Sequence, residues 1–271
     1  MDLDIKNKVA IVTGTNNPLG IGAATALALA EEGVKIAMIF KRVKQSYNPA
    51  KINDLGTDWY KKKIAGDASE TEAALKNKNV PYMVIEADIR CENEVKTCYD
   101  AIESELGPVD ILVNNSALYI DDDNILMVTK NNFDDVYDIN VKGVTFMMRE
   151  FVTRYIDHNR KFGRIINLST DAAEFFATQI IYGSSKAAVE ALTRAVALEV
   201  AHLGITVNAI APGPIQTGWL DSVSKQAILP DIPVGRIGMP EDIANAIVFL
   251  TSNKASWITG QILKVAGGHA L

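Results

Sequence analysis

Short apolar segments alternate with amphipathic segments along the whole chain, and this alternation restricts the fold more than any other feature. The apolar segments are rich in Val and Ile, which is typical of strands covered by helices on both faces. They predict strands at residues 9–13, 34–40, 82–87, 110–113, 164–168, 206–210 and 261–265. The intervening segments predict helices at residues 21–32, 92–106, 132–159, 181–203 and 241–251. This order predicts right-handed βαβ crossovers and an α/β fold with a doubly wound parallel sheet.

With 271 residues the chain is long enough for two domains of typical size. No linker, repeat or low-complexity tract divides it, so we predict a single domain across residues 1–271. A net charge of -6 leaves no basic surplus to bind a phosphate backbone, which argues against a nucleic-acid partner. The charged N-terminus leads straight into a strand-like segment, and no apolar run approaches a membrane span in length. We therefore expect a cytoplasmic protein with reduced thiols at Cys91 and Cys98 and no membrane partner.

The connection between the second and third predicted strands is longer than a simple crossover needs. The surplus lies at about residues 43–68 and contains Tyr47, Trp59, Tyr60 and a run of lysines at 61–63. One interpretation is a solvated surface excursion with a lysine-rich face, and we favour it because such segments are common. The other is a lid or partner-binding insertion that uses its aromatic side chains, because long loops in compact domains are often functional.

The first predicted strand is followed by the sequence TGTNNPLGIG and then by an alanine-rich helix. Glycine lets a backbone turn tightly and approach a pyrophosphate, and a helix N-terminus offers free N–H groups and a positive dipole. A glycine pattern alone is a weak signal, but here it opens the first βα unit, where a doubly wound sheet binds a dinucleotide. The residues expected to contact the cofactor in this turn are Gly14, Asn16, Asn17, Gly20, Ile21 and Gly22.

The end of the second predicted strand indicates which dinucleotide is bound. An enzyme that uses NAD usually has Asp or Glu here to hold the ribose 2′-hydroxyl. This chain has Phe40, Lys41 and Arg42 instead, and two cations suit the 2′-phosphate of NADP. The alternative is that both cations are ordinary surface side chains at the end of a strand and bind no cofactor. We expect NADP(H) to be preferred over NAD(H).

Tyr182 and Lys186 are four residues apart in the sequence YGSSK, so on a helix they share one face. A phenol with its ordinary pKa is a poor acid–base catalyst at neutral pH. A nearby ammonium favours the phenolate and would lower the pKa of the tyrosine towards the working range. A single tyrosine and lysine at this spacing are common by chance. Here the spacing indicates a catalytic pair, because a hydroxyl residue lies upstream and a dinucleotide site is predicted in the same chain.

These motifs resemble those of the short-chain dehydrogenase/reductase family. Five further segments share the resemblance: NNSA at 114–117, DINVKG around Asn140, PGPIQT at 212–217, GRIGMPEDIA at 235–244 and ITGQILKVAGG at 258–268. The similarity is to the branch that includes 3-oxoacyl-acyl-carrier-protein reductases, and it runs from about residue 8 to residue 268. It implies one Rossmann-type domain with a seven-stranded parallel sheet. It also implies a homo-oligomer, a tetramer or a dimer assembled through the two long helices.

The resemblance also implies roles for individual residues. Tyr182 would protonate the carbonyl oxygen of the substrate, and Lys186 would lower the tyrosine pKa and hold the nicotinamide ribose. A serine hydroxyl would polarise the carbonyl, and Asn140 would bind a water that links Lys186 to solvent. The further positions expected to contact the cofactor are Asp88, Ile89, Asn114, Pro212, Gly213, Ile215 and Thr217.

The identity of the catalytic hydroxyl depends on how the residues are counted. The family's spacing back from Tyr182 gives Ser169, whereas the register counted forward from the GRIIN strand gives Thr170, because the loop is one residue shorter. Successive strand residues point to opposite faces, so only one of them can reach the cleft. We favour Ser169. The sequence TGTNNPLGIG also departs from the family pattern, because two extra residues precede its second glycine.

These observations predict an NADPH-dependent oxidoreductase that reduces the carbonyl of a small-molecule substrate to a secondary alcohol, with a 3-oxoacyl thioester as one candidate substrate. The alternatives are an NAD-linked polyol or sugar alcohol dehydrogenase and a non-catalytic dinucleotide sensor. No metal site is expected, because the three histidines are scattered. We expect the acidic run at 121–123 to be a solvated loop.

Overall fold

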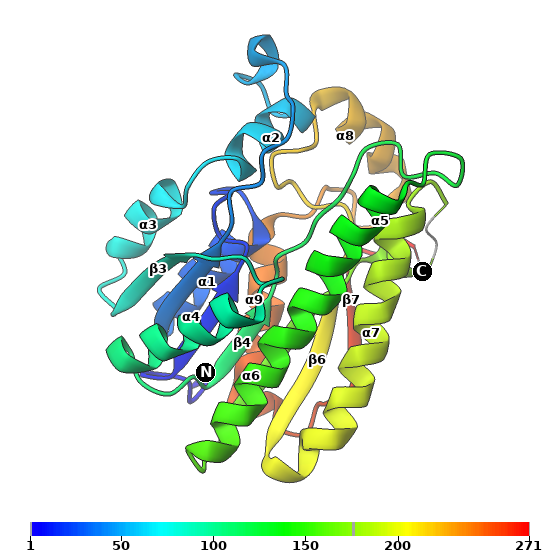
Figure 1. The fold of residues 1–271 in the computed structure, drawn as a ribbon. Coiled ribbons are helices and arrows are strands. Elements are labelled where there is room, and N and C mark those ends of the chain that lie inside the picture. The colour runs from blue at the N-terminus through cyan, green and yellow to red at the C-terminus, as the bar shows by residue number, and fades with distance from the viewer. Residues whose placement is uncertain (1, 175–176, 271) are drawn as a thin grey trace.

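A computed structural model describes residues 2–174 and 177–270, and the strands of this part form one parallel seven-stranded sheet (Figure 1). The strands are β1 (Val9–Thr13), β2 (Lys35–Phe40), β3 (Tyr82–Glu86), β4 (Ile111–Asn114), β5 (Gly163–Leu168), β6 (Ile205–Pro212) and β7 (Ile262–Val265). Their order is β3-β2-β1-β4-β5-β6-β7, so the direction of winding reverses between β1 and β4. The predicted α/β fold with a doubly wound sheet in a single domain is confirmed.

Helices cover both faces of the sheet. The α-helices of the described part are α1 (Ile21–Glu31), α2 (Thr57–Ile64), α3 (Ser69–Lys76), α4 (Glu92–Glu105), α5 (Lys130–Tyr137), α6 (Val144–Asp157), α7 (Ile180–Val200), α8 (Ser222–Ile228) and α9 (Pro240–Thr251). Short 3-10 turns lie at Pro49–Lys51, Asp171–Ala173, Ala201–Leu203, Leu229–Asp231 and Asn253–Ala255. No helix of the described part is both long enough and apolar enough to cross a membrane.

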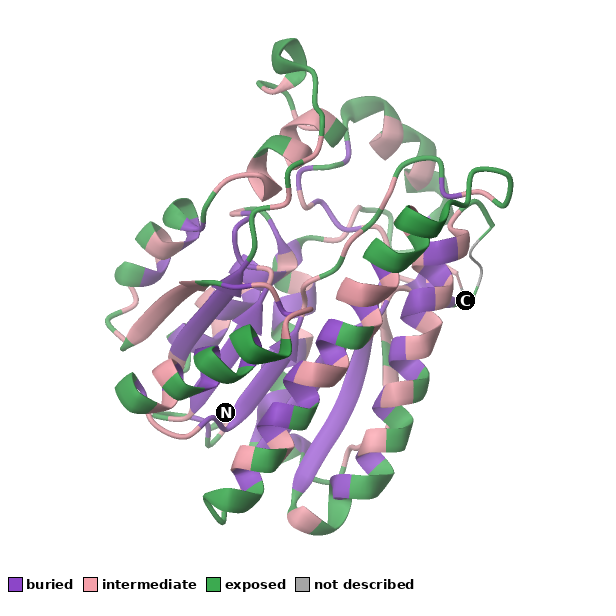
Figure 2. Cartoon of the chain, in the orientation of Figure 1, coloured by how far each residue is buried: buried purple, intermediate pink, exposed green. Residues whose placement is uncertain are grey.

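The core consists of two apolar layers, one on each face of the sheet (Figure 2). Alternate residues of β1 belong to different layers, because successive strand side chains point to opposite faces. Val9 and Ile11 pack with α4, α6 and α7, whereas Ala10 and Val12 pack with α1 and α9. This two-sided burial explains why the strands are apolar at nearly every position.

The structure differs from the predicted helices in two places. The segment 132–159 was expected to be one helix, but a π-helical turn at Asp138–Gly143 joins α5 to α6. The short helices α2, α3 and α8 were not predicted, and α2 belongs to the surplus segment 43–68. All the strands run in parallel, so their carboxyl ends meet at one edge of the sheet, where the predicted site residues lie.

Candidate active site

The glycine-rich turn between β1 and α1 has the geometry that a dinucleotide requires. Gly14 has a φ of +71°, and a Cβ atom on Gly22 would lie 2.4 Å from the Gly14 carbonyl oxygen. Gly20 precedes the helix without a side-chain cap, and the first turn of α1 holds no acidic residue. The N-terminal N–H groups and the positive helix dipole are therefore available to a pyrophosphate. These residues fit a nicotinamide dinucleotide.

Thr13 and Asn115 hold this turn against the end of β4. The Thr13 hydroxyl accepts hydrogen bonds from the backbone N–H groups of Asn115, at 3.0 Å, and Ser116, at 2.9 Å. The Asn115 amide donates to the carbonyl oxygens of Thr13, at 2.8 Å, and Gly14, at 3.0 Å. Asn115 is not among the predicted site residues, although its place in the NNSA motif could have indicated it. It keeps the path of the glycine turn fixed.

Asn16 and Asn17 are buried, and their side-chain amides bind other parts of the chain. Asn16 Nδ2 donates to the carbonyl oxygens of Ile64, at 2.9 Å, and Gly66, at 3.2 Å. Asn17 Nδ2 donates to the carbonyl oxygen of Thr217 at 2.9 Å. The two extra residues of the glycine turn therefore connect it to α2 on one side and to the segment after β6 on the other.

Two exposed cations follow β2, as the sequence indicates. Phe40 is buried, and Lys41 and Arg42 leave the sheet edge into solvent. Arg42 Nη2 lies 3.5 Å from Glu86 Oε2 on the neighbouring strand β3, in a pair that is itself exposed. Exposed pairs of this kind contribute little to stability, so Arg42 is free to exchange Glu86 for a stronger anion.

The predicted adenine-side residues have three different environments. Both carboxylate oxygens of Asp88 accept hydrogen bonds from Arg90, and this holds the pKa of Asp88 below its usual value. Ile89 is buried against Gly143, where a Cβ atom would lie 2.7 Å from its side chain. Asn114 Nδ2 donates to Asn167 Oδ1 at 2.9 Å, whereas its buried Oδ1 has no partner in the described part of the chain.

The segment after β6 is held by close backbone contacts. A Cβ atom on Gly213, which follows Pro212, would lie 2.8 Å from the Ala266 side chain, so glycine lets this segment pass β7. Ile215 is buried and forms an isolated bridge with Gly238. The Thr217 carbonyl accepts the amide of Asn17 described above. The predicted nicotinamide-side residues therefore lie next to the glycine turn.

Tyr182 and Lys186 occupy the first two turns of α7, where Lys186 is buried and Tyr182 is half-buried. Lys186 Nζ donates to the Leu168 carbonyl oxygen at 2.7 Å and lies 5.7 Å from the centroid of the Tyr182 ring. The Tyr119 ring meets the Tyr182 ring edge to face, with 5.6 Å between centroids. The predicted pair is thus brought to the carboxyl end of β5.

The pKa of Tyr182 is shifted in the direction opposite to the one expected from the sequence. Burial raises it above its ordinary value, with smaller contributions from Tyr60, Asp171 and Tyr119. Burial also lowers the pKa of Lys186 to about 8. Desolvation disfavours the charged form of each group, and it is the largest cause of the shift at Tyr182 and the cause of the shift at Lys186. Tyr182 is accordingly a neutral phenol at physiological pH.

Asp123 fixes the start of the helix that carries Tyr182. This buried carboxylate accepts hydrogen bonds from the backbone N–H groups of Ile181, at 2.9 Å, and Tyr182, at 2.8 Å. The expectation of a solvated loop is therefore wrong for Asp123. It holds for Asp121 and Asp122, which are exposed. No sequence signal indicates this role, because the donors lie far along the chain.

Asn140 lies in the π-helical turn and joins three elements. Its Nδ2 donates to the Leu118 carbonyl oxygen and to Ser185 Oγ, both at 3.0 Å, and its Oδ1 accepts the Leu118 N–H at 2.7 Å. The side chain thus links the segment after β4 to the helix of Tyr182 and Lys186. The wider π-helical turn also leaves backbone groups outside the usual helical pattern.

The two candidate hydroxyls have different environments. Ser169 is buried and donates to Glu190 Oε1 at 2.8 Å. Thr170 is partly exposed, and its Oγ1 accepts the backbone N–H of Ala172 at 3.3 Å. Its own O–H is 3.4 Å from Asp171 Oδ1, which is a weak contact. Asp171 in turn pairs with His269.

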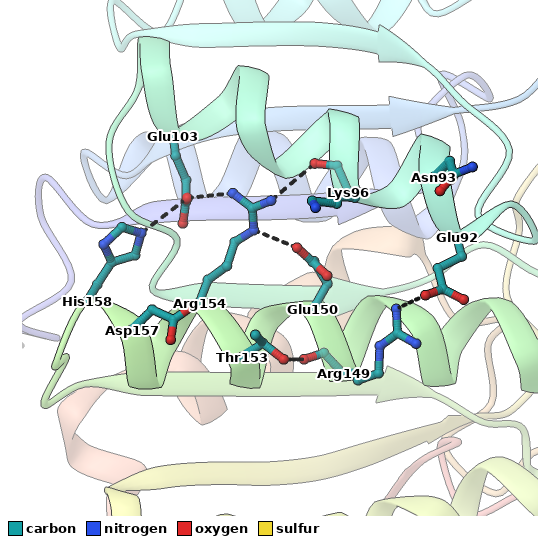
Figure 3. Close-up of a pocket in the computed structure, with 10 residues that line it drawn as sticks. All are labelled: Glu92, Asn93, Lys96, Glu103, Arg149, Glu150, Thr153, Arg154, Asp157 and His158. Atoms are coloured by element: carbon teal, nitrogen blue, oxygen red, sulfur yellow. Dashed lines mark hydrogen bonds and ion pairs between the residues drawn. The ribbon is translucent and has the colours of Figure 1, made fainter.

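A large surface cavity of about 610 Å³ lies elsewhere, between α4 and α6 (Figure 3). Arg154 crosses it and pairs with Glu103 and Glu150 at 2.8 and 2.7 Å, and His158 contacts Glu103 (Figure 3). None of the predicted site residues line it. Within the described residues no group of three or more His, Cys, Asp or Glu side chains could hold a metal ion.

Comparison with known proteins gives concordant matches. Residues 55–270 match the family model described as enoyl-(acyl carrier protein) reductase. The chain is 37% identical to a 3-oxoacyl-acyl-carrier-protein reductase of Staphylococcus aureus, covering 96% of this chain and 97% of the relative. It is 33% identical to the hydroxy(phenyl)methylsuccinyl-CoA dehydrogenase subunit BbsD of Thauera aromatica, over 99% of both chains. A short-chain type dehydrogenase/reductase from Mycobacterium marinum superimposes with a TM-score of 0.83 at 26% identity, over 99% of this chain and 97% of that one.

Proposed function

The chain belongs to the short-chain dehydrogenase/reductase family of NAD(P)-dependent oxidoreductases, and we propose that it reduces a ketone to a secondary alcohol with NADPH. The observation that carries this proposal is the neutral, half-buried phenol of Tyr182 beside the Lys186 ammonium, at the carboxyl end of β5. A reductase needs a proton donor at this point, and a raised tyrosine pKa keeps the proton in place.

In the proposed reaction Tyr182 donates its phenolic proton to the carbonyl oxygen of the substrate. The nicotinamide would supply the hydride to the carbonyl carbon. Lys186, 5.7 Å from the Tyr182 ring, stabilises the phenolate that remains until solvent returns the proton. Asn140 binds both the segment after β4 and Ser185, and so fixes the position of that segment relative to Tyr182 and Lys186. The developing alkoxide is stabilised where the donors converge.

We assign the second donor to Thr170 in preference to Ser169. The proton of Ser169 is already donated to the buried carboxylate of Glu190, so its use would leave that carboxylate without the bond. Thr170 is more exposed, and its proton has only a long contact to Asp171. The register counted from β5 supports the same choice.

The cofactor preferred is NADP(H). Lys41 and Arg42 at the end of β2 supply two cations where an NAD enzyme would carry a carboxylate. The weak, exposed pair between Arg42 and Glu86 supports this choice, because Arg42 gains more from a 2′-phosphate than from Glu86. The remaining cofactor contacts would come from the glycine turn and the segments around Asp88, Asn114 and 212–217.

The substrate class is a small molecule that carries a ketone. A 3-oxoacyl thioester is one candidate, since the Staphylococcus aureus relative is named for such a compound. The test is a panel of free ketones and acyl thioesters assayed with NADPH and with NADH. Ketone-dependent oxidation of NADPH supports the proposal. Activity confined to NAD-linked oxidation of polyols would replace it with the dehydrogenase alternative.

We also propose that the chain forms a homodimer or homotetramer. The support is the exposure of two large apolar side chains: Leu198 of α7 is 84% exposed, and Trp257, in the turn before β7, is 98% exposed. Contact with a second copy of the chain would remove the apolar surface of these side chains from water. Light scattering gives the native mass, and a monomer would contradict the proposal.

A further inference from the structure

The sequence predicts cofactor contacts for both asparagines of the glycine turn, and the structure gives their side-chain amides partners within the protein. Asn17 is 5% exposed, and its side chain is bonded at both ends. Its Oδ1 accepts the Leu19 N–H at 3.1 Å, inside the turn, and its Nδ2 donates to the Thr217 carbonyl oxygen at 2.9 Å. A buried side chain therefore joins the turn after β1 to the segment after β6, 200 residues further along the chain.

The segment that contains Thr217 is a tight turn held together by the side chain of Gln216, which is itself buried. Gln216 Oε1 accepts the Gly218 N–H at 3.1 Å, and Nε2 donates to the Leu220 carbonyl oxygen at 3.2 Å. The Gln216 N–H donates to the Gly238 carbonyl oxygen at 2.9 Å, which anchors the turn to the rest of the fold. Because the backbone around Thr217 is braced internally, a contact at its carbonyl oxygen fixes the position of the whole turn.

The surplus segment, residues 43–68, holds the same turn at the next residue. The Gly56 N–H donates to the Gly218 carbonyl oxygen at 2.8 Å. Trp59 of α2 packs on Gly218, where a Cβ atom would lie 2.1 Å from Cζ3 of the indole. Figure 1 shows α2 beside α8, the helix that follows this turn. These contacts attach residues 43–68 to the predicted site, so the segment is not a solvated excursion over its whole length.

The glycine turn, the turn at Thr217 and the surplus segment form a closed ring of contacts. Asn17 links the first to the second, and Asn16 links the first to the third through the carbonyl oxygen of Ile64. The glycine turn is assigned to the pyrophosphate and Thr217 to the nicotinamide. Because both groups belong to one molecule, the separation of the two turns decides whether it can occupy both at once. The residues assigned to the adenine side take no part in these contacts: Lys41, Arg42, Asp88, Ile89 and Asn114.

We propose that Asn17 is a positioning residue that fixes Thr217 relative to the glycine turn, and so places the nicotinamide half of the dinucleotide without giving its own amide to the cofactor. This inference rests on the proposed NADP(H)-dependent function. Loss of the Asn17 donor releases the Thr217 carbonyl oxygen, so the nicotinamide half should bind more weakly. The adenine half should bind as before, because the residues assigned to it lie outside the ring.

The experiment compares NADPH with 2′,5′-ADP, a fragment that carries the adenine half and its phosphates and lacks the nicotinamide. Calorimetry gives the affinity of each for the wild type, Asn17→Ser and Asn17→Thr. Both variants are uncharged and keep a hydroxyl that can accept the Leu19 N–H, but their side chains are too short to reach Thr217. Asn77→Ser, at an exposed asparagine that follows α3, is the matched control. Hydrogen exchange of the free proteins follows the turn at residues 213–220.

Asn17→Ser should weaken NADPH by about threefold to tenfold, the size of one net hydrogen bond, and should leave 2′,5′-ADP unchanged. Exchange in residues 213–220 should become faster, whereas exchange in β3 should stay the same. Asn17→Thr should act in the same direction if Asn17→Ser folds poorly, and Asn77→Ser should alter neither affinity. This pattern separates positioning from a general loss of structure, which would weaken both ligands.

Three results overturn the proposal. An equal loss for NADPH and 2′,5′-ADP means that Asn17 serves only the glycine turn, and an unchanged affinity for NADPH means that the contact with Thr217 places nothing. Unchanged exchange in residues 213–220 in both Asn17 variants means that the contact does not hold the turn. If the wild type binds NADPH but reduces no ketone, the proposed reaction fails, and the two affinities still decide the role of Asn17. If it binds no dinucleotide, both proposals fail.

Discussion

The carboxylate of Asp123 accepts a hydrogen bond of 2.8 Å from the backbone N–H of Tyr182, so the acidic side chain fixes the first turn of the catalytic helix. The same carboxylate binds the N–H of Ile181, and the Asp123 carbonyl accepts the N–H of Ile180. Three N–H groups that would otherwise be unpaired at the start of α7 are thus satisfied by one residue. The position of the phenol depends on this contact.

Replacement of Asp123 by alanine should therefore reduce both stability and turnover. We expect a loss of about 1–2 kcal/mol in the free energy of unfolding, as for the removal of a helix cap. The value of kcat should fall further than the affinity for NADPH, because most of the expected cofactor contacts come from the glycine turn and the ends of the other strands, not from the first turn of α7. Denaturant unfolding and steady-state kinetics measure the two effects. Asp122→Asn, at the exposed neighbouring position, is the control, and equal losses in both variants would contradict a positioning role for Asp123.

Alanine at Thr170 and alanine at Ser169 should have different effects. Thr170→Ala should lower kcat by about a hundredfold, the usual loss when one donor to a developing oxyanion is removed. Thr170→Ser keeps a hydroxyl and should recover most of the activity. Ser169→Ala should mainly cost stability, because it removes the hydrogen-bond donor to Oε1 of the buried Glu190. Single-turnover rates at saturating NADPH check the assignment, and a large kinetic loss confined to Ser169→Ala would reverse it.

The preference for NADPH over NADH should depend mainly on Arg42. Arg42→Ala should raise KM for NADPH by roughly tenfold to a hundredfold, the value of a charge-assisted bond to phosphate, and should leave KM for NADH nearly unchanged. Glu86→Gln removes the competing partner and should tighten the binding of NADPH. Fluorescence titration of both cofactors provides the measurement. Equal affinity of the wild type for NADH and NADPH would remove the assignment.

The pH dependence of reduction follows from the two shifted pKa values. Burial raises the pKa of Tyr182, so the proton donor stays protonated through the neutral range. Burial lowers the pKa of Lys186 to about 8, so its positive charge is present below that pH and lost above it. The value of kcat for reduction should be flat below about pH 8 and decline as the pH rises further. Lys186→Arg keeps its charge and should remove the decline, although its activity will be lower. A decline on the acidic side only would contradict this assignment.

The fold could be predicted from the sequence because burial on both faces makes each strand apolar at successive positions. The bounds of β1 agree with the structure residue for residue, and β5 and β7 differ by one residue at the start. The helices α2, α3 and α8 were missed because each has only seven or eight residues, and periodicity gives little signal over so short a segment.

The residues of the site could be predicted only where they belong to a recognisable sequence motif. Tyr182 and Lys186 share a helical face, and Gly14 and Gly22 share a turn, so their spacing alone indicates proximity. The break in the helix at Asn140 depends on a contact with Leu118, and the role of Asp123 depends on a helix 58 residues away in the chain. The pKa of Tyr182 was predicted to fall, whereas desolvation raises it, because a sequence does not show how far a phenol is removed from water.

The measurement that tests the central claim most directly is ketone-dependent oxidation of NADPH by the wild type and by Tyr182→Phe. Phenylalanine keeps the ring and the packing against Tyr119 and removes the hydroxyl group that carries the reacting proton. The wild type should oxidise NADPH when a ketone is added, and Tyr182→Phe should bind NADPH with unchanged affinity and show no ketone-dependent oxidation. Unchanged turnover in Tyr182→Phe would contradict the account.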